Sequence, residues 1–281
     1  MIPYSLFCGM IKKRICIQEG ERWMDDILFK DACNKIINVE RTRIGIGTLS
    51  EKTTHAVLKH FYEPDVSNHE IKIHNYIADI FKENEIIEIQ TGNFNVMRKK
   101  LNIFLADYPV TIVYPIVHTK WLFWIDEETG QITKKRKSPK SGTPYEVFYE
   151  LYKIKHHLTN PNLHLMLALI DTEEYRLLNG WSDDRKRGSR RYDRIPVNLA
   201  DEVYIDGPHE YDKLIPDNLL DPFTTKDYAK SSRLSVSLAQ TALNVLFHVG
   251  AVERIGKKGN AYVYRKKERT EHTSSQGTEL L

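Results

Sequence analysis

The sequence predicts a mixed α/β domain, with a central sheet flanked by helices, followed by a small winged-helix domain. Three patterns in the 281-residue chain lead to this prediction. Apolar, β-branched runs at 76–81 and 86–90 flank a short polar break, which is typical of a β-hairpin. A helical pattern at 95–106 and a β-branched run at 110–117 follow, an order that favours parallel strand pairing. From Phe223 onward, two helical patterns precede two short strands around a Gly-Lys-Lys-Gly-Asn turn, the layout of a winged helix-turn-helix.

The remaining elements follow from the spacing of apolar residues. We expect a helix after Ser50, which is a plausible N-cap, with Leu49, Val57, Leu58 and Phe61 as its buried stripe. The other expected elements are a helix over 21–37, extended chain over 69–81, a hairpin over 121–135, a helix over 145–157, a strand over 163–170, and C-terminal helices over 225–231 and 235–249.

Charge and composition divide the chain into five segments. Basic blocks at 134–140 and 185–194 are followed by an acidic stretch up to Pro222 and a basic one after it, which indicates modules joined by a linker. The predicted division is an N-terminal extension (1–44), an α/β core (45–180), a linker (181–222), the winged helix-turn-helix (223–267) and a disordered tail (268–281).

Composition excludes several classes of protein. The net charge is only +3, so the basic blocks rather than the overall charge point to a polyanionic partner. Cys8, Cys16 and Cys33 form no CxxC pair, so we expect neither a disulfide framework nor a zinc site. No apolar run approaches the roughly 20 residues of a membrane span, and the start lacks a signal-peptide layout. A reduced, cytoplasmic location and no membrane partner are the resulting expectations.

Two acidic residues, Asp79 and Glu88, carry the strongest functional signal. If the hairpin closes symmetrically about residues 83–84, Asp79 stands opposite Glu88, and Gln90 lies on the same face as Glu88. Facing residues bring their Cβ atoms to about 4.5–5.5 Å, where two like charges destabilise the sheet. A cation between the two carboxylates would remove this repulsion, and a hard divalent ion such as Mg²⁺ suits oxygen ligands.

These residues and the order of the elements around them resemble the PD-(D/E)XK nuclease superfamily, over roughly residues 45–170. The matching features are the helix that carries Glu51, the strand that ends at Ala78-Asp79, the strand Glu88-Ile89-Gln90, the crossover helix and the buried strand after it. The resemblance implies a restriction-endonuclease-like sheet and metal-dependent cleavage of phosphodiester bonds.

The resemblance also implies roles for individual residues. Asp79 and Glu88 would bind Mg²⁺, or Mn²⁺ as a substitute, together with the main-chain carbonyl of Ile89. Glu51 would be the additional acid that resolvase-like members carry on this helix. Gln90 stands where the family usually has a lysine, which is thought to orient or polarise the attacking water.

The chemistry can also be considered without the family. Phosphodiester hydrolysis needs an in-line water and neutralisation of the charge that builds on the phosphate oxygens, and a metal held by two carboxylates supplies both. Gln90 can hydrogen-bond the water but cannot take its proton, so the base is metal hydroxide, His55 or bulk solvent. Lys99 or Lys100 can supply a cation near the phosphate; the alternative for both is a solvated helix face.

The C-terminal helix over 235–249 is expected to enter the major groove of DNA. The predicted contacts are Ser235, Ser237 and Gln240 to the bases and Arg233, Lys257 and Lys258 to phosphates.

The function predicted from the sequence is that of a Mg²⁺-dependent DNA endonuclease, with DNA held by the winged helix. Two alternatives stay open: a catalytically inactive, nuclease-fold protein that binds DNA or regulates, and a nuclease subunit of a transposase. The presence of both Asp79 and Glu88 favours the enzyme. The sequence leaves open whether the substrate is DNA or RNA and whether a homodimer is needed to cut both strands.

Overall fold

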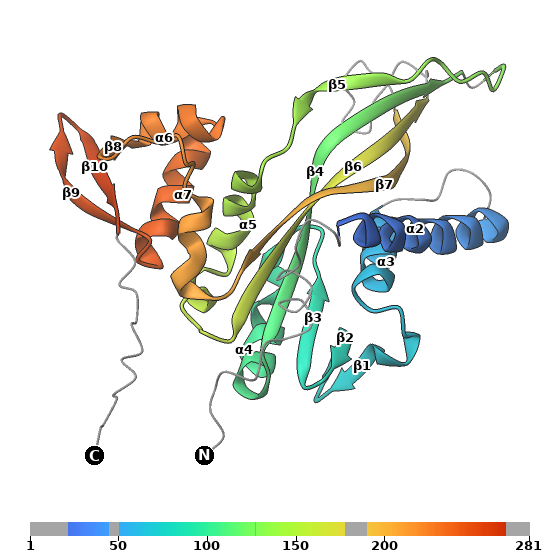
Figure 1. Ribbon diagram of the computed structural model, residues 1–281, viewed down its shortest axis with the longest axis horizontal. Coiled ribbons are helices and arrows are strands. Elements are labelled where there is room, and N and C mark those ends of the chain that lie inside the picture. The colour runs from blue at the N-terminus through green and yellow to red at the C-terminus, as the bar shows by residue number, and fades with distance from the viewer. Residues whose placement is uncertain (1–21, 45–50, 127, 178–189, 268–281) are drawn as a thin grey trace, which may run out of the picture.

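A computed structural model describes residues 22–44, 51–126, 128–177 and 190–267 (Figure 1). Within these ranges, one mixed sheet contains the strands β1 (His69–Ile73), β2 (Tyr76–Lys82), β3 (Glu85–Ile89), β4 (Val110–Ile125), β5 (Arg136–Ser141), β6 (Leu163–Leu177) and β7 (Arg190–Ile205). The strand order is β1-β2-β3-β4-β6-β7, with β5 paired to β4. Strands β3, β4 and β6 run parallel, whereas every other pair in this sheet is antiparallel.

Helices cover both faces of this sheet. They are α2 (Arg22–Ile44), α3 (Glu51–Tyr62), α4 (Arg98–Asp107) and α5 (Phe148–Lys153), with short 3₁₀ turns η2 (Val66–Asn68), η3 (Phe94–Met97), η4 (Pro144–Val147), η5 (Lys155–His157) and η6 (Pro208–Leu214). Figure 1 shows α2 and α3 on one side of the strands and α4 and α5 on the other, and each side has its own hydrophobic cluster. The mixed α/β class predicted from the sequence is confirmed.

The buried faces of the helices agree with the apolar spacing in the sequence. Val57, Leu58 and Phe61 of α3 are buried as expected, while Leu49 lies outside the described residues. On the opposite face of the sheet, α4 buries Leu101, Phe104 and Leu105, which share one side of the predicted helix. The strand–helix–strand unit β3-α4-β4 is parallel, as predicted.

Three expectations about the core are wrong in detail. The chain over 69–81 is not one extended segment, because it turns at His74 and Asn75, where His74 has a φ of 52°, and forms the antiparallel pair β1–β2. The helix expected over 145–157 contains only α5, flanked by η4 and η5. The hairpin expected over 121–135 closes by a bridge between Ile125 and Ile132, but its regular pairing is made by β5, further along the chain.

The segments assigned to an extension and a linker contribute to the core. Residues 190–205, within the predicted linker 181–222, form β7 at the edge of the sheet. Helix α2, within the predicted extension, packs Phe29 and Cys33 into the cluster under α3, and the Cys33 thiol lies 3.3 Å from the Pro196 carbonyl. Strands β4, β6 and β7 continue together past the helical layers (Figure 1). The predicted tail at 268–281 lies outside the described residues.

The C-terminal module contains β8 (Phe223–Thr224), α6 (Thr225–Ser232), α7 (Val236–His248), β9 (Val252–Lys258) and β10 (Ala261–Lys266). Thr224 and Asp227 form a capping box that starts α6, and the Ser235 hydroxyl accepts a hydrogen bond from the Leu238 N–H to start α7. The strands form a small antiparallel sheet of order β8-β10-β9. This is the predicted winged-helix arrangement.

The C-terminal module packs directly on the α/β core. A single hydrophobic cluster includes Phe148 and Leu151 of α5, together with Tyr228 of α6 and Leu243 of α7. The rings of Phe148 and Tyr228 meet edge to face at 6.5 Å, and the Tyr228 hydroxyl donates to the Leu214 carbonyl at 2.7 Å. Figure 1 shows α7 lying beside α5. The module is therefore joined to the core by buried apolar contacts as well as by the chain.

Over the described ranges, no helix has the length and apolar character needed to cross a membrane.

Replacing Phe148 with alanine should destabilise both parts of the molecule together. Its side chain is fully buried where α5 meets the C-terminal module, so Phe148→Ala should cost about 3–5 kcal/mol of unfolding free energy. The neighbouring Tyr149 is 63% exposed and provides a matched control, Tyr149→Ala, with an expected change under about 0.5 kcal/mol. Urea unfolding followed by circular dichroism and by tryptophan fluorescence measures both. Two well-separated transitions in the wild type would contradict a shared core.

Candidate active site and nucleic-acid interface

The β2–β3 hairpin brings Asp79 and Glu88 together. Its turn residues Glu83 and Asn84 both have positive φ, 50° and 62°, which is the two-residue turn that matches the twist of a hairpin. The register pairs Phe81 with Ile86, as the sequence predicts for this turn.

The two acids accept hydrogen bonds across the hairpin. The Asp79 N–H donates to Glu88 Oε1 at 3.3 Å, and the Ile89 N–H donates to Asp79 Oδ2 at 2.8 Å. Each carboxylate therefore accepts a main-chain N–H of the opposite strand, which holds both carboxylates at the junction of β2 and β3.

The sheet is irregular at Asp79. Ala78 and Ile80 lie two residues apart but contribute to the clusters on opposite faces, so the usual alternation of a strand is interrupted between them. On the neighbouring strand, Glu70 has a φ of 55° and lies between the paired residues His69 and Ile71. Such an irregularity redirects side chains. Here it makes Asp79 accessible from α3, whereas Glu88 is reached from α4.

A cationic or ionisable side chain from each of two helices contacts the pair. His55 of α3 places Nε2 at 3.2 Å from Asp79 Oδ2, and Lys100 of α4 donates to Glu88 Oε2 at 2.6 Å. The side chain of Glu88 is only 5% exposed, while those of Asp79 and Lys100 are about one-fifth exposed. The arrangement is a partly buried cluster of two acids, one histidine and one lysine.

The two carboxyl groups differ in acidity. Burial, followed by the negative charge of Asp79, raises the pKa of Glu88 to about 7, despite the opposing effect of Lys100. Burial also acts to raise the pKa of Asp79, but the hydrogen bond and charge of His55, with the Ile89 N–H, outweigh it and hold that pKa below its ordinary value. Of the two acids, Glu88 is therefore the one whose charged form is, on balance, destabilised by burial.

Three other residues were predicted to belong to the site: Gln90, Glu51 and Ile89. The Gln90 side-chain amide donates to the Gly92 carbonyl, a contact local to the end of β3. Glu51 is the first residue of α3, but its side chain lies outside the described residues. The Ile89 side chain is buried under α3, and a role of its carbonyl as a metal ligand stays a prediction.

Glu70 is a further acid near this cluster. It bonds to Lys59 of α3 at 2.8 Å, and this contact holds its pKa below the ordinary range although the charge of Asp79 opposes the shift. Glu70 is 69% exposed, so it lies at the open edge of the cluster.

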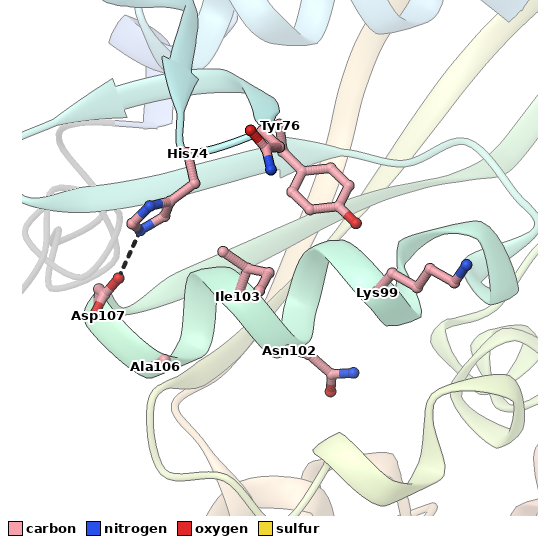
Figure 2. Close-up of a pocket in the computed structure, with 8 residues that line it drawn as sticks. His74, Tyr76, Lys99, Asn102, Ile103, Ala106 and Asp107 are labelled. Carbon is pink, nitrogen blue, oxygen red and sulfur yellow. Dashed lines mark hydrogen bonds and ion pairs between the residues drawn. The ribbon is translucent and has the colours of Figure 1, made fainter.

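The phase of α4 places Lys99 and Lys100 in different surroundings. A pocket of about 640 Å³ lies between the β1–β2 turn and the outer side of α4. Figure 2 shows that Lys99 lines it together with Tyr76 and Ile103. An ion pair between His74 and Asp107, 2.9 Å long, closes one end of this pocket. Lys99 thus lies on the outer side of α4, whereas Lys100 contacts Glu88.

The residues predicted to contact DNA lie on one end of the C-terminal module. Ser235, Ser237 and Gln240 are exposed at the start of α7, although the Ser235 hydroxyl is engaged as the N-cap. Arg233, which terminates α6 with a φ of 59°, is also exposed, as are Lys257 and Lys258 at the end of β9.

One basic residue of this module was missed by sequence reasoning. The Arg254 guanidinium lies 4.4 Å from the ring centroid of Phe247 and 4.3 Å from that of Tyr262. Aromatic residues in both positions are visible in the sequence, but their stacking on arginine depends on the pairing of β9 with β10 against α7.

Comparison with known proteins gives one family and one relative. The chain is 29% identical over 146 residues to an uncharacterized protein of Treponema pallidum (strain Nichols), an alignment that covers 52% of this chain and 56% of the relative. The chain thus spans about half the length of the curated relative it matches. No solved structure matches it. The model of the family described as "Domain of unknown function (DUF8091)" matches residues 52–206, which include α3, the whole sheet and both acids of the hairpin. The chain belongs to this DUF8091 family.

Proposed function

We propose that this chain is a metal-dependent endonuclease that hydrolyses phosphodiester bonds in DNA, and that its C-terminal module holds the DNA. The observation that carries the proposal is the pair Asp79 and Glu88 on adjacent strands, with Lys100 at 2.6 Å from Glu88. Carboxyl groups with shifted pKa values cluster at functional sites, because catalytic groups need pKa values matched to their task, and Glu88 is such a group.

The donor chemistry of the pair fits Mg²⁺. This ion binds through one or two carboxylates and completes its shell with water and substrate phosphates, so two acids suffice. Over the described side chains, no group of three His, Cys, Asp or Glu residues could hold a metal, so water and phosphate oxygens would have to supply the remaining ligands. The raised pKa of Glu88 supports the same view, because a cation beside it would relieve its burial as an anion. Mn²⁺, with the same preference for oxygen, is the natural substitute.

The residues of the chain would divide the work of hydrolysis. Water attacks phosphorus, the bond to the leaving oxygen breaks, and the water proton passes to a base. His55, whose Nε2 lies 3.2 Å from Asp79 Oδ2, is in position to accept that proton. Lys100 supplies from α4 the positive charge that Gln90 lacks, and its ammonium can neutralise a phosphate oxygen. The bound ion would lower the pKa of the attacking water and offset charge on the phosphate.

An inactive DNA-binding protein is the second candidate, and one observation favours it. The Gln90 amide is bonded to Gly92, so it would have to leave that carbonyl to orient a water. Lys100 and His55 also give both acids a partner without any metal. Cleavage assays on matched variants separate the two candidates.

Removing the charge of Asp79 should abolish cleavage without unfolding the protein. Asp79→Asn keeps the shape of the side chain but weakens a metal ligand, so cleavage of plasmid DNA with Mg²⁺ or Mn²⁺ should fall at least about 100-fold. Glu70→Gln is the control, because it neutralises an exposed acid next to the cluster. Equal activity of wild type and Asp79→Asn, or no cleavage by wild type with either metal, would argue for the inactive protein.

Adjacent lysines of α4 provide a second matched pair. Lys100→Ala removes the cation beside Glu88, and the rate of plasmid cleavage should fall about 10–100-fold, while Lys99→Ala should stay within about twofold of wild type. Melting temperatures of both variants control for folding. If the two substitutions lower the rate equally, Lys100 acts only through the general charge of the helix.

The raised pKa of Glu88 predicts how stability depends on pH without metal. The folded state holds a proton on Glu88 up to about pH 7, whereas the unfolded chain releases it near pH 4.5. The folded state therefore binds more protons in this window, and wild-type stability should fall, relative to Glu88→Gln, as pH rises from about 5 to 8. The change should reach at most about 3 kcal/mol. Urea unfolding in EDTA at several pH values measures it; a constant difference between the two proteins would contradict the shift.

A further inference from the structure

A groove of about 700 Å³ lies in the C-terminal module between α7 and the β9–β10 hairpin. Three cationic residues line it, Lys226, Arg254 and Lys258, and none of the residues that line it is acidic. Amides from both walls, including Gln240 and Asn244 of α7, complete the polar lining. The groove therefore has an excess of positive charge and of hydrogen-bond donors.

Arg254 is held in place by aromatic rings rather than by an acid. Its guanidinium lies between Phe247 of α7 and Tyr262 of β10, each about two-fifths exposed, at 4.4 and 4.3 Å from the ring centroids. Within the described residues, no carboxylate forms an ion pair with it, whereas Arg265 on the same hairpin lies 3.9 Å from Glu253. Arg254 thus keeps its full charge while its side chain is already ordered, which lowers the entropic cost of binding an anion.

Asn244 is oriented from outside the module. Lys155, just beyond α5, donates to Asn244 Oδ1 at 3.1 Å. That hydrogen bond fixes the orientation of the amide, and the NH₂ group of Asn244 is then available to donate to a ligand. A lysine, an arginine and an amide NH₂ are all donors, and the ligand that matches such a set is an oxyanion.

We propose that this groove is a phosphate-binding site for the backbone of duplex DNA, with Arg254 as its anchoring cation. The proposal rests on that part of the proposed function in which the C-terminal module holds DNA. The proposal places the centre of DNA binding in the groove between α7 and the β9–β10 hairpin, rather than at the exposed start of α7. With its faces against the two rings, the Arg254 guanidinium would bind a phosphate through the N–H groups along its edge, a bidentate contact that lysine cannot reproduce.

The test measures binding apart from cleavage. A fluorescently labelled DNA duplex is titrated with the full-length chain in EDTA, and anisotropy is read between 50 and 200 mM NaCl. Arg254→Ala should weaken binding about tenfold or more at 100 mM salt and reduce the log–log salt slope by about one unit. Arg254→Lys should keep most of the slope, because the charge remains, yet lose affinity several-fold because the planar contact is gone. Arg265→Ala should stay within about twofold.

Folding and competition controls keep the outcome decisive. Arg254→Met retains an unbranched stem between the rings, so it should fold with a near-native melting temperature and still lose affinity. The proposal is overturned if Arg254→Ala and Arg254→Met bind within twofold of wild type. It is also overturned if polyglutamate of matched charge displaces the duplex as well as unlabelled DNA does, because the groove would then select charge rather than phosphodiester. Binding that depends on Arg254 without any metal-dependent cleavage would support the groove and refute the endonuclease.

Discussion

The pairing of β2 with β3 around a two-residue turn determines where Asp79 and Glu88, the two central acids of the candidate site, lie. Because Glu83 and Asn84 both adopt positive φ, the hairpin closes without a bulge at its tip and fixes the register of the strands behind it. A shift of one residue would turn Glu88 to the opposite face, away from Lys100. The parallel pairing of β3 with β4 then anchors this hairpin at the middle of the sheet, where both faces are covered.

The electrostatics of the site follow from its position between two helical layers. His55 approaches Asp79 from α3, while Lys100 approaches Glu88 from α4 on the other face, so the two acids are compensated independently. The negative charges are nevertheless compensated unequally, because the pKa of Asp79 is lower than usual and the pKa of Glu88 is higher. The irregularity opposite Glu70 lets the Asp79 carboxylate reach His55 of α3 while it still accepts the Ile89 N–H beside Glu88.

Local patterns in the sequence were sufficient for the hairpin and its acids. The turn is short and its flanking runs are apolar, so the pairing of Phe81 with Ile86 and of Ile80 with Ile87 follows without long-range information. The same pattern brings Asp79 near Glu88, but it did not predict that the alternation of β2 is interrupted at Asp79. The phase of α4 was harder, because the difference between Lys99 and Lys100 is one residue of helix and depends on where the helix packs.

Strand β7 could not be recognised from local sequence. Its charged residues and Pro196 are typical of a linker. Its antiparallel pairing with β6 joins segments that no short turn pattern connects in the sequence. A polar edge strand needs only one covered face, so its apolar signal is weak. The turn at His74 was missed for a related reason: it contains neither Gly nor Pro, and its positive φ is imposed by the pairing of β1 with β2. Arg254 lay beyond sequence reasoning because its two aromatic partners come from different elements.

Helix α5 and the turn after it join the candidate active site to the groove of the C-terminal module. On one side, Glu150 of α5 accepts a hydrogen bond from the Phe94 N–H at 2.7 Å, shortly after the end of β3, the strand that carries Glu88. On the other side, Phe148 packs on Tyr228, and Lys155 bonds Asn244 in the wall of the groove. Buried apolar contacts and hydrogen bonds through one short element leave little freedom for the module to rotate against the sheet. If the groove holds a phosphate backbone and the acid pair cleaves one, the spacing between the bound and the cleaved phosphates is therefore set by the rigid path through α5, rather than by a flexible linker.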